Sequence, residues 1–173
     1  MDGAVPAAVD PVLGQVTLRG GELPWRGVSP RLRTVRLILL AVALVPAVLA
    51  AAILAVLLTA WLWLAVGGLL VLGVWAAWLI GRQVSAISWI EIEEELVIRK
   101  GRLLRSLVSV PYGRMQFVDL ASGPLLRAFD LAALELHTGS PESGGSIPGL
   151  PTQEAEALRS RLAARGESQR AGL

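Results

Sequence analysis

The segment Leu37–Gly81, LILLAVALVPAVLAAAILAVLLTAWLWLAVGGLLVLGVWAAWLIG, contains 45 residues and no charged side chain. A membrane-spanning helix needs about 20 apolar residues, so the segment is too long for one span and suits two spans joined by a tight turn near Leu58–Leu62. Because backbone polar groups in lipid must be satisfied within the chain, both spans are expected to be helical. The sequence therefore predicts a two-helix transmembrane hairpin over residues 36–82.

Arginines flank this segment and indicate its orientation. Before the first span stand Arg19, Arg26, Arg31, Arg33 and Arg36, and after the second span stands Arg82. Arginine-rich flanks remain on the cytoplasmic side, so we expect both termini in the cytoplasm. The preference for arginine over lysine suggests a bacterial genome, which makes the expected location a bacterial plasma membrane. A cleaved signal peptide is disfavoured because the apolar run greatly exceeds a signal core.

Small residues recur at every fourth position in both expected spans. They are Ala43, Ala47, Ala51 and Ala55 in the first span, and Gly73, Ala77 and Gly81 in the second. This spacing allows helix backbones to approach closely in lipid. We expect the two stripes to pack against each other, with packing against another subunit or a partner as the alternative. Neither span contains an ionisable side chain, which argues against a transporter or proton channel.

The residues after the hairpin show short alternating runs that predict strands. These runs are Ile90–Ile92, Leu96–Lys100, Leu103–Val110, Met115–Leu120 and Leu131–Thr138. A short helical turn is expected after Pro124, a loop over 139–146 and a helix from Pro151. The expected fold is a small β-barrel or sandwich over 86–166, capped by the C-terminal helix. Residues 1–35 are expected to be a partly disordered cytoplasmic segment, and 167–173 a disordered tail.

Two runs carry a resemblance to a known family: VPYGRMQFVDLASGPLLRAFDLAALELHTG, Val110–Gly139, and IPGLPTQEAEAL, Ile147–Leu158. They resemble the bacterial PH-like domain of YdbS-like membrane proteins, where a strand ending in Ile-Pro is followed by Arg-Ile-Gln-x-Val, Gly-Pro-Leu-x-Arg and Gly-Leu-Ala. The matching positions are Pro111, Arg114, Gln116, Val118, Gly123, Pro124, Leu125, Arg127, Leu131 and Ala132.

This resemblance covers about residues 24–165 and has two departures. Met115 replaces a usual Ile, and Asp130 replaces a usual Gly, although Asp tolerates tight turns. The resemblance implies a PH-like fold on the cytoplasmic face. It supplies neither a reaction nor a ligand. Relatives often accompany a larger membrane protein with several such domains, which implies assembly with a partner.

Residues able to support catalysis or metal binding are scarce. The chain has no cysteine, and His137 is its single histidine, so a His/Cys metal site is excluded. Glu91 and Glu93–Glu95 lack the spacing of a calcium loop. We interpret His137 as a surface residue and the glutamates as a solvated strand edge or turn. No catalytic, cofactor or metal site is predicted, and we expect no enzyme.

A basic hairpin is the stretch with most functional interest. Arg99, Lys100, Arg102 and Arg105 are candidate contacts for lipid or a partner, because they lie on consecutive strands close to the membrane. Each basic residue near an anionic leaflet gains about 1 kcal/mol. A solubilising turn is the simpler interpretation, and the same leaflet would repel the preceding Glu93–Glu95.

We therefore expect a non-enzymatic scaffold for envelope protein assembly. The alternative is an anionic-lipid-sensing module, and a two-span pore is a remote third. Expected partners are membrane lipids and either a membrane protein with related PH-like domains or a second copy. Residues 82–173 hold eleven basic and eleven acidic side chains, so this part is neutral and no nucleic acid is expected.

Overall fold

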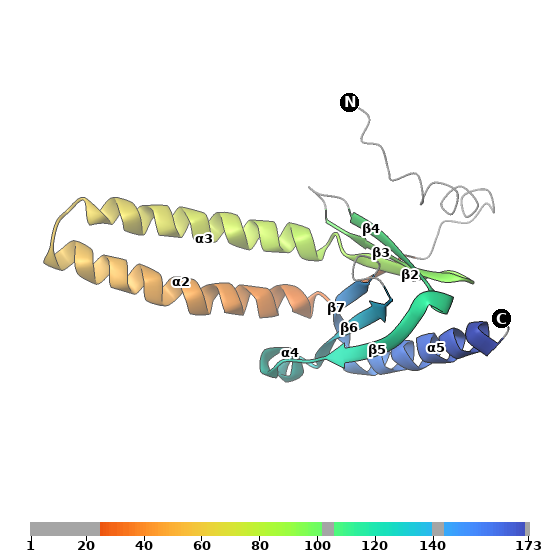
Figure 1. Ribbon diagram of the computed structural model, residues 1–173. Helices are drawn as coiled ribbons and strands as arrows, with labels where there is room; N and C mark the ends of the chain where they lie inside the picture. Colours follow the sequence, from red (N-terminus) through yellow and green to blue (C-terminus); the bar gives the residue numbers. More distant parts are fainter. Residues whose placement is uncertain (1–24, 102–105, 140–143, 172–173) are drawn as a thin grey trace, which may run out of the picture.

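The computed structural model describes residues 25–101, 106–139 and 144–171 and consists of a long helical hairpin joined to a domain of two small sheets and a helix (Figure 1). The elements along the chain are β1 (Arg26–Gly27), α2 (Arg31–Leu57), α3 (Leu62–Val84), β2 (Ser88–Glu91), β3 (Glu95–Lys100), β4 (Ser106–Pro111), the 3-10 turn η1 (Tyr112–Arg114), β5 (Met115–Ala121), α4 (Pro124–Ala128), β6 (Leu131–Thr138), β7 (Gly145–Pro151) and α5 (Thr152–Ala171).

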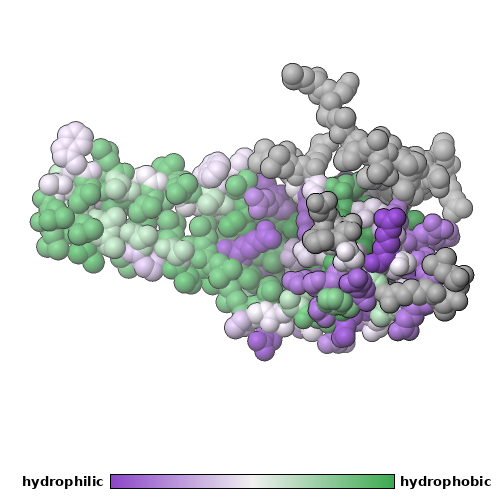
Figure 2. Space-filling view, viewed as in Figure 1, coloured by the Kyte–Doolittle hydropathy of each residue, from purple (hydrophilic) through white to green (hydrophobic). Residues whose placement is uncertain are grey.

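Helices α2 and α3 form the hairpin predicted from the charge-free segment. The turn between them falls at residues 58–61, within the expected region. Their outward side chains are apolar and exposed, as Figure 2 shows in green along the hairpin. A long core helix of a soluble protein would instead be mostly buried, so exposure favours contact with lipid. Helix α2 begins at Arg31, five residues earlier than the predicted hairpin, and Pro46 lies inside it without ending it.

The contact between α2 and α3 matches the predicted small-residue stripes only in part. Ala55 is buried, but Ala43 and Ala47 are exposed and Ala51 is half-buried. On α3, Gly73 is buried and lies against the Leu44 side chain, while Ala77 and Gly81 are half-buried. Around Ala43 and Ala47, the face of α2 that contacts α3 is thus shifted by one residue from the expected stripe. This shift brings a leucine rather than an alanine opposite Gly73.

The domain contains two antiparallel sheets that do not close into a barrel. The first has the order β1-β2-β3-β4, and the second has the order β5-β6-β7. The predicted strands correspond to β2 to β6, although positions 103–105 of the third run lie outside the described residues. Strands β1 and β7 were not predicted. The expected loop over 139–146 ends within β7, since Gly145 and Ser146 already pair with β6.

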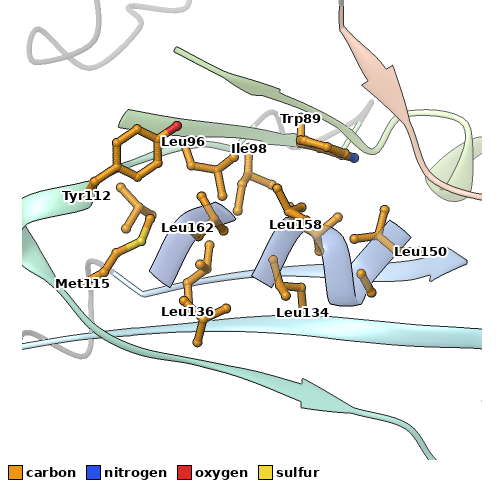
Figure 3. Packing of buried hydrophobic residues seen from close by; sticks show 14 of the residues in the cluster. Trp89, Leu96, Ile98, Tyr112, Met115, Leu134, Leu136, Leu150, Leu158 and Leu162 are labelled. Atoms are coloured by element: carbon orange, nitrogen blue, oxygen red, sulfur yellow. The ribbon is translucent and has the colours of Figure 1, made fainter. Parts of the chain in front are cut away.

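The main core lies between the two sheets and α5. Figure 3 shows side chains of both sheets and of α5 pointing into one interior, including Trp89, Leu134 and Leu158, each with no exposed surface. Ala155, Leu158 and Leu162 form an apolar stripe on α5 and are all buried. Each large apolar side chain contributes about 1.5–3 kcal/mol when fully buried. The helix therefore closes one face of the domain.

Helix α5 extends further than predicted. It runs to Ala171, whereas residues after 166 were expected to form a disordered tail. Its later turns lie against η1: a Cβ on Gly166 would be 3.6 Å from the Tyr112 carbonyl oxygen, and one on Gly113 would be 3.3 Å from Gln169 Oε1. This contact gives the last turns a surface to pack on. Residues 1–35 were predicted to be partly disordered; within 25–35 the chain forms β1 and the start of α2, and residues 1–24 lie outside the described residues.

A second hydrophobic cluster joins the domain to the base of the hairpin. It contains Leu32 and Val35 of α2, Val84 and Ile87 at the end of α3, and Leu131 of β6. Side chains of α4 and its C-terminal turn cover this cluster, namely Leu125, Leu126 and Phe129. The Gly-Pro-Leu run of the resemblance thus forms a short helix that packs beside the hairpin base.

Candidate functional site

Two residues of the predicted basic hairpin, Arg99 and Lys100, are described, and both are hydrogen-bonded within the domain. Arg99 lies near the end of β3, where its Nε donates a hydrogen bond of 3.1 Å to Ser88 Oγ. Its guanidinium carbon lies 4.8 Å from the centre of the Trp25 ring, a cation–π arrangement. Arg99 therefore ties β3 to β2 and to the segment that precedes β1.

Lys100 points to the opposite face of the strand and bridges the two sheets. Its Nζ donates a hydrogen bond of 3.1 Å to Ser146 Oγ at the start of β7. Burial lowers the pKa of the Lys100 ammonium below its ordinary value, and the positive charge of Arg36 lowers it further. Arg102 and Arg105, the other two predicted contacts, lie outside the described residues. The four predicted residues therefore do not form one described patch.

The acidic stretch lies at the other end of β3. Glu95 begins the strand and accepts a hydrogen bond from Ser109 Oγ, while Lys100 ends it. Glu91 accepts from Arg161 Nη2 at 2.8 Å and lies 3.7 Å from Arg165 Nη1, so α5 neutralises it. Because Ser88 pairs with Arg99 and closely follows the end of α3, it is the Lys100 end that faces the hairpin.

A cleft of about 390 Å³ opens between the ends of the two sheets. Its lining includes Lys100, Ser106, Glu135, His137 and Ser146. His137 Nε2 lies 3.8 Å from Glu135 Oε2, and both side chains are nearly half exposed. Among the residues that the structure describes, no group of three or more His, Cys, Asp or Glu could hold a metal ion. The cleft offers hydroxyl and charged groups for binding.

An exposed aromatic pair lies next to this cleft. The Phe117 ring stacks on the His137 ring with centroids 4.3 Å apart and an interplanar angle of 13°. Phe117 is 51% exposed, and every other exposed large hydrophobic side chain in the described residues belongs to the hairpin. Strict alternation would place Phe117 on the same face as the buried Met115, so the sequence did not indicate its exposure; an irregularity of β5 between Met115 and Phe117 turns it outward.

Sequence reasoning missed the residues that join the domain to the hairpin. Gly149 has φ +71, and its backbone oxygen accepts a hydrogen bond of 2.9 Å from the Ser29 N–H. A Cβ at this position would lie within 3 Å of three Leu32 side-chain atoms. Arg36 was assigned only to the membrane flank, yet its charge acts on Lys100. No periodic pattern connects positions so distant in the sequence.

Asp130 explains a departure from the family pattern. It is the one non-glycine residue of the described chain with a positive φ, at 55°. Glycine adopts this conformation without strain, which accounts for the glycine usual at this position in the resembling family. Aspartate is among the residues that tolerate it best. The turn after α4 is therefore retained, with its Asp130 N–H bonded to the Arg127 oxygen.

Comparison with known proteins agrees with the fold. The bacterial PH domain family matches residues 35–166, which include nearly all of both spans and the domain. A "UPF0699 transmembrane protein YdbS" from Bacillus subtilis (strain 168) is 40% identical over 74 residues, or 41% of this chain. The aligned part spans 45% of that relative's length. No solved structure matches the chain significantly. Because the family match covers well over half of the sequence, the chain belongs to the bacterial PH domain family, as a membrane protein similar to YdbS.

Proposed function

We propose that the protein is a non-enzymatic scaffold that presents its PH-like domain at the cytoplasmic face of a bacterial plasma membrane for envelope protein assembly. The observation that carries this proposal is the second hydrophobic cluster, in which Leu32 and Val35 of the hairpin pack with Leu131 of the domain. A domain on a flexible tether would need no such cluster. Packing at the junction gives the domain one orientation relative to the membrane, as a fixed docking platform requires.

The expected orientation rests on the arginines at the base of the hairpin. The start of α2 and the end of α3 lie together beside the domain, and Arg31, Arg33, Arg36 and Arg82 are all found there. Cytoplasmic segments carry such an excess of arginine. The domain and both ends of the hairpin then lie on the cytoplasmic side, and the turn at residues 58–61 lies on the other.

The Phe117–His137 pair is the surface that we assign to partner contact. An exposed Phe gains free energy when a partner covers it, and aromatic residues are enriched among the few that dominate binding. The partner class that fits the family context is another membrane protein with related PH-like domains, or a second copy of this chain. The second candidate function, sensing of anionic lipid, is favoured by the position of Lys100 at the hairpin base.

Site-specific photo-crosslinking in native membranes tests the scaffold. A photoreactive phenylalanine analogue replaces Phe117 in the full chain, and the control carries it at Glu156, an exposed position on α5. A discrete crosslinked membrane protein or dimer from position 117, absent from position 156, is the expected result. The unlabelled Phe117→Ser variant should also lose that partner on mild solubilisation.

Two results would count against the proposal. Recovery of the chain alone at both positions would remove the stable-scaffold function and leave lipid sensing. Equal crosslinking at positions 117 and 156 would show that contact is nonspecific, which would remove the assignment of the Phe117–His137 pair.

A further inference from the structure

Four cations from the hairpin and the domain gather where the two parts meet. They are Arg33 and Arg36 of α2, Arg82 of α3 and Lys100 of β3, here called the junction belt. The Arg33 guanidinium lies against Gly81, where a Cβ would be 3.3 Å from Arg33 Nε. The Arg82 guanidinium lies 4.5 Å from the Trp78 ring centre. Figure 2 shows hydrophilic side chains in this position, between the apolar hairpin and the rest of the domain.

No carboxylate neutralises the junction belt within the described chain. The ion pairs of the described residues join Arg26 to Glu154, Glu91 to two arginines of α5, and Glu135 to His137. None involves the belt. The exposed Glu93 and Glu94 precede the far end of β3, and that strand is about 17 Å long at 3.4 Å per residue. Among the described residues, the belt is therefore a cluster of like charges with no carboxylate paired to it.

Two further observations favour an anion as the partner of this cluster. Arg82 Nε is enclosed and has no acceptor among the residues that the structure describes. Enclosed arginine donors are ordinarily hydrogen-bonded, because an unmet one is costly. In addition, burial and, to a smaller extent, the positive charge of Arg36 disfavour the charged form of Lys100. A bound anion would satisfy the donor and offset the positive charge of Arg36.

The depth of the belt indicates which anion is available. The apolar part of the hairpin ends at Gly81, directly before Arg82, and Trp78 lies one turn deeper. Tryptophan is typical of the membrane–water interface, and a leaflet places its phosphates at that level. Guanidinium groups bind phosphate oxygens through paired, charge-assisted hydrogen bonds.

We propose that the junction belt binds the phosphate of an anionic membrane lipid and that this lipid holds the domain against the hairpin. The inference rests on the membrane orientation proposed above but not on a protein partner. Three of the four residues belong to the hairpin, so the site exists only in the full chain. An anionic lipid is preferred over a zwitterionic one because the belt has no acidic group to pair with a headgroup ammonium.

Lipid retention by the full chain tests the site. The protein is assembled in nanodiscs of phosphatidylcholine mixed with phosphatidylglycerol, and retained lipids are counted by native mass spectrometry. The R36Q/K100Q variant removes one cation from each part, R36K/K100R keeps both charges, and Arg114→Gln removes an exposed cation on η1. At about 1 kcal/mol per charge, R36Q/K100Q should prefer phosphatidylglycerol about 30-fold less than the wild type, while the other two variants retain the preference.

A second measurement connects binding to the junction. Hydrogen exchange at the Ser29 amide, which bonds to Gly149, should be slower in mixed nanodiscs than in phosphatidylcholine alone, and R36Q/K100Q should abolish the difference. Equal lipid retention by R36Q/K100Q and wild type would overturn the site. Inorganic phosphate added to phosphatidylcholine nanodiscs should not slow exchange at the Ser29 amide. If it slowed exchange as much as phosphatidylglycerol does, the lipid would be overturned as the ligand of the site. Crosslinking from position 117 is independent of both outcomes, so failure here is distinguishable from failure of the scaffold.

Discussion

Replacing Gly149 by alanine should open the junction between the domain and the hairpin. Gly149 has φ +71, and an added Cβ would approach Leu32 Cδ2 to 2.7 Å, Cβ to 2.8 Å and Cγ to 2.9 Å. These atoms belong to a residue that is only 3% exposed. Because Leu32 is packed on all sides, it has little room to withdraw, and the start of α2 must move away from β7.

Three contributions set the magnitude of this effect. A left-handed conformation costs a non-glycine residue about 1–2 kcal/mol. Exposing the Leu32 side chain loses up to about 1.5–3 kcal/mol of burial. The hydrogen bond from Ser29 to Gly149 contributes about 1 kcal/mol. Since Leu32 need not be fully exposed, we expect Gly149→Ala to destabilise the junction by about 3–5 kcal/mol.

Hydrogen exchange of the full chain in nanodiscs measures this opening directly. A loss of about 3 kcal/mol or more corresponds to exchange at the Ser29 amide about a hundredfold faster or beyond. Gly123→Ala is the matched control, because Gly123 has φ −73 and a Cβ added to it would meet no atom within 4 Å. Leu32→Ala removes two of the three close approaches, so the added effect of Gly149→Ala should be smaller in that background.

The reasoning would be refuted if Ser29 in Gly149→Ala exchanged within about tenfold of the wild-type rate. It would also be refuted if Gly123→Ala and Gly149→Ala had equal effects. Either result would mean that the close approach of α2 to β7 does not secure the domain, and the fixed orientation proposed for the scaffold would lose its main support.

Three further predictions concern the folded domain and the hairpin. Burial raises the pKa of the Tyr112 phenol above its ordinary 10.0, although the hydrogen bond from Arg165 lowers it in part. The resulting stabilisation of the fold is present below pH 10.0 and should be lost as pH rises through the folded-state pKa. Tyr112 is the chain's single tyrosine, and phenolate absorbance reports it alone; a folded-state midpoint at or below 10.0 would contradict this. Asp130→Gly should stabilise the domain by about 0.5–1 kcal/mol in thermal unfolding, and Asp130→Ala should not. Gly73→Leu should force α2 and α3 apart and destabilise the hairpin by about 1–3 kcal/mol, whereas Gly68→Leu, at a position with nothing within 4 Å, should be tolerated in the same detergent melt.

The hairpin could be predicted from the sequence because lipid imposes one strong requirement on a long charge-free run. Its start could not, because the first turn of α2 obeys a different requirement. Leu32 and Val35 alternate with arginines and bury themselves against the domain, so the helix extends beyond the apolar segment. A composition boundary marks where lipid begins, and a tertiary contact decides where the helix begins.

Strand β7 was missed because its sequence, GSIPGLP, has the composition of a loop. It pairs with β6 on one side only, and an edge strand tolerates proline because the missing N–H need not face a neighbour. Its two glycines also serve close packing, since a Cβ on Gly145 would lie 2.8 Å from Ile98 Cδ1. The glycines that close packing requires therefore gave β7 the composition of a loop and concealed the strand pattern in its sequence.

The basic hairpin shows why spacing alone could not define the site. Successive residues of a strand point to opposite faces, so Arg99 turns to Ser88 and Lys100 turns to Ser146. The positive charge of Arg36, which comes from a helix far earlier in the chain, also acts on Lys100. A continuous motif was expected, and the cations that gather instead come from three separate elements.

The distribution of charge along β3 removes the main electrostatic objection to a lipid contact. Glu93–Glu95 lie at the start of the strand and would be expected to repel the leaflet that attracts Lys100. The strand separates the two ends by about 17 Å, which is about twice the screening length of roughly 8 Å at physiological ionic strength. Two arginines of α5 also neutralise Glu91 beside this turn. Glu93–Glu95 are thus screened from the basic end and the neighbouring Glu91 is paired, while Lys100 at the basic end takes part in none of the ion pairs of the described residues and lies close to the hairpin.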